Sequence, residues 1–248
     1  MHSAWYVNIV LSVLLQALLF CRAYVCGLSR RYPFFYTYLA YTALWTFAFS
    51  LPVFIRDPSY PTAYWLSYVL AALLRFGIAA EIHRYVFPLH SSLRTRANVA
   101  VLLALTLLAF IFWIAGPGPG PSVFPDALRK ITLSVATWIF VVLGLARYYG
   151  IRVGRNVWGI AAGVLLFTGS ELIYLAAMDL LPRLWAAWRY IHPLTFVLTL
   201  IVWASALWRY HPNPVIPSLD KSLKQDLLNA WRDRWTTVPA LVRKVVKS

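Results

Sequence analysis

The chain has 248 residues, of which 61% are hydrophobic and only 12% are charged. Soluble domains carry about a quarter charged residues, so this composition excludes an ordinary soluble domain and indicates a multi-pass membrane protein. The 23 Lys and Arg residues outnumber the 8 Asp and Glu residues, giving a net charge of +15, an excess that orients membrane helices and favours contact with anionic lipids. No basic run carries a nucleic-acid-binding motif, so no nucleic-acid partner is expected.

The sequence predicts an all-α integral membrane protein, with seven transmembrane helices in residues 1–211 and an amphipathic surface helix in the tail, residues 212–248. Crossing a bilayer takes about 20 apolar residues in a helix, and none of the apolar segments alternates as a barrel strand does. The seven segments are residues 4–21, 33–55, 62–87, 98–115, 131–146, 156–178 and 185–208.

Polar side chains within the first two segments are few and regularly spaced. Asn8, Ser12 and Gln16 recur every four residues in the first segment, which places them on one side of a helix. The second segment carries the hydroxyls of Thr42 and Thr46 among many aromatic residues. The fourth segment has almost no polar side chain and is the one expected to face lipid.

The third segment has an arginine, Arg75, at its midpoint. A charge at the centre of a membrane helix costs about 2.5–3.5 kcal/mol on insertion scales, so Arg75 needs a partner. Glu81, six residues further on, is rotated by about 120° around the helix and lies near the end, where it is expected to reach water or basic neighbours. Glu171 in the sixth segment is the deeply placed acid, and the sequence predicts that it pairs with Arg75.

Polar and aromatic residues share the helix faces of this predicted pair. The predicted site comprises Arg75, Glu171, Tyr64, Tyr68, Thr168, Tyr174, His192, Thr195 and Thr199. Together they are expected to line an aromatic-walled cavity, reached from the outer side between the third, sixth and seventh segments. The alternative is a structural ion pair that only fixes helix packing. Gly159 and Gly163 form a GxxxG pair that allows a close helix contact.

The charges of the connecting loops predict the orientation. Seventeen of the 23 basic residues follow the first, third, fifth and seventh segments, whereas five lie in the other connections. Because basic loops stay in the cytoplasm, the N-terminus is expected outside and the C-terminus inside. The predicted location is the plasma membrane, of the bacterial inner-membrane type, with anionic lipids as partners at the cytoplasmic face.

The tail has the pattern of a helix that lies on a membrane surface. Apolar residues recur every four positions, at Leu219, Leu223, Leu227 and Trp231. Basic residues accompany them, at Lys221, Lys224, Arg232 and Arg234. A lipid anchor is the first interpretation, and a docking helix for a protein partner is the alternative.

Three functional classes remain open from the sequence. A receptor-like or small-ligand-binding membrane protein, taking a small molecule from the outer side, is preferred. A small-molecule or ion transporter is second, and a membrane-embedded enzyme is third, because no catalytic constellation is found. No cofactor and no metal site is expected: His83 and His192 lie at different depths, so they cannot ligate one haem together.

Overall fold

Each predicted apolar segment forms most of a long helix. The computed structural model describes residues 2–50, 60–87, 92–115, 123–180 and 182–211. The helices are α1 (His2–Cys26), α2 (Leu28–Arg31), α3 (Pro33–Ser50), α5 (Tyr60–Val86), α6 (Ser92–Ala115), α7 (Val123–Tyr148), α8 (Arg155–Leu180) and α9 (Pro182–Leu207). In these ranges the chain forms no strand.

Within the described ranges, five helices are long and apolar enough to cross a membrane, namely α1, α5, α6, α7 and α8. The apolar part of α9, Ile191–Leu207, is shorter, and α3 is diluted by tyrosine and threonine residues that turn inward. An all-helical protein with five candidate spans is therefore established, and the count of seven spans stays a prediction. The tail with its predicted surface helix lies outside the described ranges, as do residues 51–55 of the second segment.

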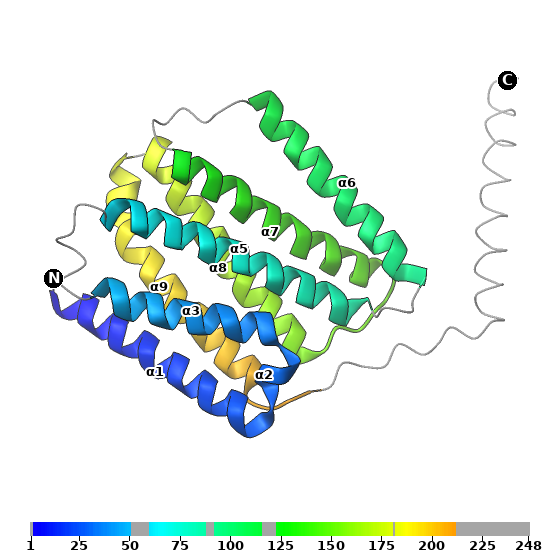
Figure 1. Cartoon of the computed structure of the whole chain (residues 1–248), viewed down its shortest axis with the longest axis horizontal. Helices are drawn as coiled ribbons and strands as arrows, with labels where there is room; N and C mark the ends of the chain where they lie inside the picture. Colours follow the sequence, from blue (N-terminus) through cyan, green and yellow to red (C-terminus); the bar gives the residue numbers. More distant parts are fainter. Residues whose placement is uncertain (1, 51–59, 88–91, 116–122, 181, 212–248) are drawn as a thin grey trace, which may run out of the picture. The chain divides into compact units, whose positions relative to one another are not determined.

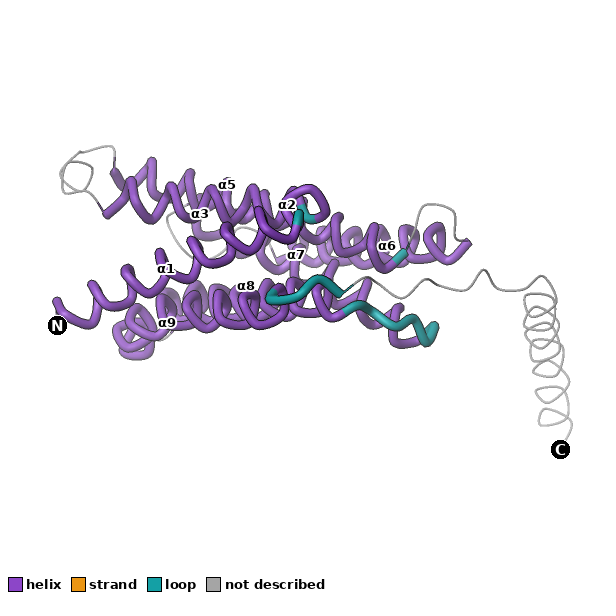
Figure 2. The backbone as a smooth tube through the Cα atoms, turned by 90° about the horizontal axis from the view of Figure 1, so that it is seen from below, coloured by secondary structure: helices purple, strands orange, loops and turns teal. Residues whose placement is uncertain are grey.

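Six helices form a closed ring. In order around it, α1 packs on α9, α9 on α8, α8 on α7, α7 on α5, α5 on α3, and α3 on α1. The long helices alternate in direction along the chain, so the ring neighbours α1 and α9, and likewise α5 and α7, run parallel (Figures 1 and 2). Helix α6 packs against α7 outside this ring. Its large apolar side chains are mostly exposed, as a lipid-facing helix requires and as the sequence predicts.

The tightest contact in the ring joins α8 to α9. A Cβ atom built on Gly163 would clash with the indole of Trp203, and one built on Gly159 would clash with Ala206. The two glycines of the GxxxG pair therefore let α9 approach the α8 backbone, as the motif indicates. Trp203 is fully buried there, and its indole nitrogen donates to the Ile160 carbonyl at 3.2 Å.

Two buried polar side chains form hydrogen bonds to helix ends at the end of the bundle away from the N-terminus. Glu81 of α5 accepts a hydrogen bond from the Phe35 amide in the first turn of α3 at 3.2 Å, where a helix has unpaired N–H groups. Asn156 of α8 donates to the carbonyls of Ala206 and Arg209 at the end of α9, at 3.2 and 3.1 Å. The expectation that Glu81 reaches water is wrong, because it is only 3% exposed.

Candidate functional site

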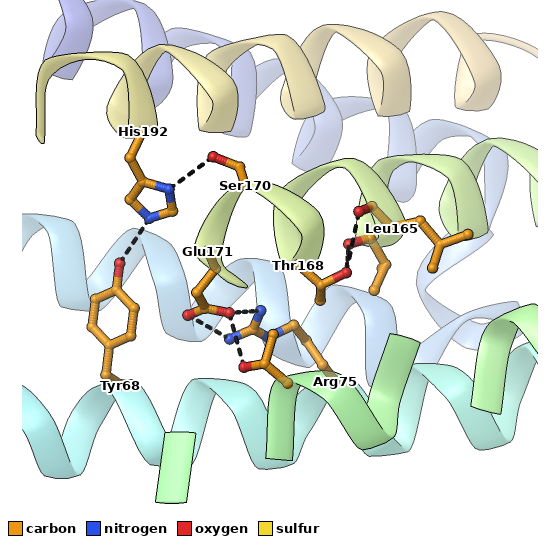
Figure 3. A network of polar contacts seen from close by, with 9 residues as sticks. Tyr68, Arg75, Leu165, Thr168, Ser170, Glu171 and His192 are labelled. Atoms are coloured by element: carbon orange, nitrogen blue, oxygen red, sulfur yellow. Dashed lines mark hydrogen bonds and ion pairs between the residues drawn. The ribbon is translucent and has the colours of Figure 1, made fainter. Parts of the chain in front are cut away.

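Arg75 and Glu171 form a buried ion pair between α5 and α8. Arg75 Nη2 donates to Glu171 Oε1 at 3.0 Å and Nη1 donates to Oε2, with the two side chains 1% and 0% exposed. Thr132 of α7 donates its hydroxyl to Glu171 Oε2 at 3.1 Å. Figure 3 shows Arg75 and Glu171 facing each other in the pairing expected from the sequence. Thr132 adds a third helix to it. Buried charges are tolerated when they are paired and hydrogen-bonded in this way.

His192 of α9 is held from four sides. Its Nε2 lies 3.2 Å from the Tyr68 hydroxyl of α5 and its Nδ1 lies 3.1 Å from the Ser170 hydroxyl of α8, as Figure 3 shows. The rings of Phe167 and Tyr174 stack on its two faces, each with a centroid 5.3 Å away. A neutral imidazole has one donor and one acceptor nitrogen, so one hydroxyl donates to the ring and the other accepts from it.

A cavity of about 340 Å³ lies beside these two clusters. It is lined by the first half of α1, by α3, by the first part of α5, by the middle and later part of α8 and by the middle of α9. These parts of the helices lie toward the N-terminal end of the ring (Figure 1). Its size is at the lower end of the usual range for ligand pockets, which is about 300–1,000 Å³. The aromatic residues of its wall are Tyr38, Tyr41, Trp45, Tyr64, Tyr68, Phe167, Tyr174 and Phe196.

The structure gathers most of the predicted site residues around this cavity. Five of them line it, namely Tyr64, Tyr68, Arg75, Tyr174 and His192. Glu171 is bonded to Arg75 but is not part of the lining.

Three predicted site residues, Thr168, Thr195 and Thr199, are buried but do not line the cavity. Their hydroxyls donate to carbonyls one turn earlier in their own helices, at 2.8 Å from Thr168 to Val164 and 2.9 Å from Thr199 to Thr195. This local bond satisfies a hydroxyl inside an apolar helix without any partner from another element.

Sequence reasoning missed the contribution of α1 and α3 to the cavity. Asn8 and Ser12 line it from α1, and Thr42 and Thr46 line it from α3. Gln16 Nε2 donates to the Thr42 hydroxyl at 3.4 Å and ties the two helices together. The signal that could have found them is the spacing of four residues within each set, which puts the polar groups on one helix face.

The wall of the cavity is close to electrically neutral. Among the residues that the structure describes, Arg75 is the one Lys, Arg, Asp or Glu residue that lines it, and its charge is balanced by Glu171. In the part of the chain that the structure describes, no cluster of three His, Cys, Asp or Glu residues could hold a metal ion. The arrangement can therefore bind through ring contacts and a few hydrogen bonds.

Comparisons with protein families, with curated proteins and with solved structures find no match for this chain. The geometry of the cavity is therefore the basis on which a function can be assigned.

Proposed function

We propose that this chain is a receptor-like membrane protein that binds a small molecule in the cavity between α1, α3, α5, α8 and α9. The observation that carries the proposal is the cavity itself, with its aromatic wall and a balanced ion pair at its deep end. The proposed orientation has seven spans and an external N-terminus, so the ligand enters from the outer side.

The composition of the wall indicates that the cavity is a ligand pocket and not a void left by imperfect packing. Packing alone is served by apolar side chains at interior density, whereas ligand pockets combine aromatic walls with a few placed polar groups. Here four helices, α3, α5, α8 and α9, supply rings, and Asn8, Ser12 and Arg75 supply polar groups. Polar groups around an empty space require water or a ligand as partners.

The packing beyond the deep end favours binding over transport. Trp203, Phe35, Leu39 and Ile78 are fully buried in the main apolar core. The ring of Phe35 packs against that of Trp203 with centroids 5.0 Å apart. A solute moving from the cavity to the other face would have to open this core, so a binding protein is the better-supported function.

A cavity-filling substitution tests the proposal. Ala71 lines the cavity, so Ala71→Phe places a ring in the empty space, whereas Ala80→Phe puts the same ring on the exposed side of the same helix. The probes are four naphthalenes of equal ring size: 2-acetylnaphthalene, 2-isopropylnaphthalene, 2-naphthoate and 2-naphthyltrimethylammonium. The thermal unfolding midpoint, Tm, of each purified protein is measured in detergent with and without each probe.

We expect at least one probe to raise the Tm of the wild type and of Ala80→Phe, but not that of Ala71→Phe. At a free concentration 100 times its Kd, a ligand stabilises the folded state by about 2.7 kcal/mol, which corresponds to a rise in Tm of about 5–10 °C for a chain of this size. Equal responses of Ala71→Phe and Ala80→Phe to all four probes would rule out the cavity as the binding site.

A further inference from the structure

We infer that the cavity selects an uncharged, flat ring molecule that carries a hydrogen-bond acceptor, such as an aryl ketone. The Tyr38 hydroxyl donates the hydrogen bond to this acceptor. The inference rests on the proposed binding function and specifies its ligand class. Three independent features of the cavity support it: its charge, its rings and one hydroxyl group.

The charge balance of the wall disfavours ionic ligands. A cation would meet the guanidinium of Arg75, and among the described residues the lining offers no carboxylate to pair with it. An anion at Arg75 would lie beside the fully buried carboxylate of Glu171, so two negative charges would share one cation. A neutral ligand disturbs neither charge.

The ring arrangement favours a flat ligand. Trp45, Tyr64 and Tyr68 pack against one another with centroids 5.3–5.7 Å apart, and Trp45 meets Tyr68 edge to face at 78°. Such pairs hold each ring in a fixed orientation. A flat ligand ring gains the same edge and face contacts without the entropy cost of ordering flexible side chains.

The hydroxyl of Tyr38 is a donor of the wall that remains for a ligand. Tyr38 lines the cavity, is 1% exposed, and has its ring fixed by an edge contact with Trp203 at 6.2 Å and 89°. It lies within electrostatic reach of the Arg75–Glu171 pair, at the deep end. Across the described ranges of the chain, no residue forms a hydrogen bond with its hydroxyl.

Three other hydroxyls of the wall are already engaged. Tyr41 donates to the Ser67 carbonyl at 2.9 Å, Tyr68 is bonded to His192, and Thr42 donates to the Leu39 carbonyl at 2.9 Å. A buried donor without an acceptor is costly, so a ligand carbonyl that meets Tyr38 gains more than an apolar group of the same shape.

The same four naphthalenes separate ligand classes, and Tyr38→Phe removes the hydroxyl while keeping the ring. Tyr41→Phe is the matched control, because it also removes a wall hydroxyl, but one that is engaged with the backbone. Kd values are taken from calorimetric titrations, each corrected with the Ala71→Phe protein at the same detergent concentration. This correction cancels partition of the probes into micelles.

We expect the wild type to bind 2-acetylnaphthalene about fivefold to tenfold more tightly than 2-isopropylnaphthalene, as one hydrogen bond allows, and to bind both charged probes more weakly than the ketone. Tyr38→Phe should lower the affinity for the ketone to that for the hydrocarbon and leave the hydrocarbon unchanged. Tyr41→Phe should keep the wild-type preference.

Two results overturn the ligand class while leaving the binding function intact: tighter binding of a charged probe, or equal affinity of the wild type for ketone and hydrocarbon. A preference for the ketone that survives in Tyr38→Phe overturns the role of Tyr38. If no probe distinguishes the wild type from Ala71→Phe, the binding function itself fails and the ligand class fails with it.

Discussion

At the scale of single residues, the Arg75–Glu171 pair dominates the energetics of the interior. Removing one member of a buried pair leaves the other charge uncompensated, at a typical cost of about 3–5 kcal/mol, whereas replacing both by apolar residues is often nearly neutral. We therefore expect Arg75→Met and Glu171→Met each to lower the free energy of unfolding by about that amount. The double variant should recover most of the loss, as measured by thermal or denaturant unfolding in detergent.

The double variant also distinguishes a role of the ion pair in packing from a role in ligand binding. If the pair serves only packing, the double variant should bind the naphthalene probes as the wild type does. If the pair sets the neutral character of the cavity, stability returns but the order of probe affinities changes. If the two single variants' losses in free energy of unfolding simply add in the double variant, the two side chains do not interact, in contradiction to their bidentate contact.

The ion pair was predictable and its neutral partners were not. A lone cation in the middle of an apolar segment requires an acid at similar depth, and Glu171 is the acid placed deep in another segment. The hydroxyls of Thr132 and Ser170 carry no such requirement, because a threonine or serine can bond to its own helix. Their contacts to Glu171 and His192 depend on helix rotation, which the sequence does not fix.

At the scale of helices, the start of α3 depends on a side chain from α5. The Glu81 carboxylate accepts a hydrogen bond from the Phe35 amide. It therefore acts as an N-cap of α3 that another helix supplies. Loss of an N-cap costs about 0.5–2 kcal/mol, so Glu81→Leu should destabilise the protein by at least that range, while Glu81→Gln keeps an oxygen acceptor and should lose less. Hydrogen exchange of the first-turn amides of α3 checks the cause: it should accelerate in Glu81→Leu. Unchanged exchange there would show that the carboxylate does not hold this turn.

The contact between α8 and α9 gives a second prediction at this scale. Gly163→Ala places a methyl group against the indole of the buried Trp203, and overpacking of this kind typically costs about 1–3 kcal/mol. Gly169→Ala lies on the same helix with open space around its new methyl group, so it should be neutral or stabilising by up to about 1 kcal/mol through helix propensity. Unfolding of both variants in detergent measures the difference. Equal stability of the two variants would mean that α8 and α9 do not approach at Gly163.

The existence of the long helices was predictable from apolar length, but their ends were not. The fifth segment was expected to begin at residue 131, whereas α7 begins at Val123. Its additional turns include Asp126 and Lys130, whose side chains form an ion pair at 2.7 Å across one turn. The four-residue helix α2 has no apolar periodicity to indicate it; Gly27, with φ of 60°, precedes it and permits the sharp turn after α1.

At the scale of the whole bundle, the order of helices around the ring was not predictable from the sequence. Apolar segments specify burial in a membrane but carry little information about which neighbour each one packs on. The cavity was therefore expected between the third, sixth and seventh segments, whereas the ring adds α1 and α3 to its wall. The spacing of polar residues on these two helices gains its meaning only once they are known to lie beside α5 and α9.

The orientation of the bundle yields the last prediction. The end of the ring away from the N-terminus carries Arg30, Arg31, Arg147, Arg152 and Arg155, all exposed. Basic ends stay in the cytoplasm, which places the opposite end, with the cavity, toward the outside. In a background of Cys21→Ala and Cys26→Ala, single cysteines are introduced by Ser122→Cys and Ser29→Cys and treated in intact cells with an impermeant maleimide.

We expect labelling of the Ser122→Cys protein in intact cells, and labelling of both proteins after permeabilisation, which controls for the reactivity of each thiol. Ser29 is an exposed residue of α2, at the basic end, so its cysteine should be protected until the membrane is opened. The reverse pattern would place the cavity toward the cytoplasm. Because the cavity is lined by the N-terminal half of α1, a reversed orientation would leave binding possible but would make the ligand a cytoplasmic molecule.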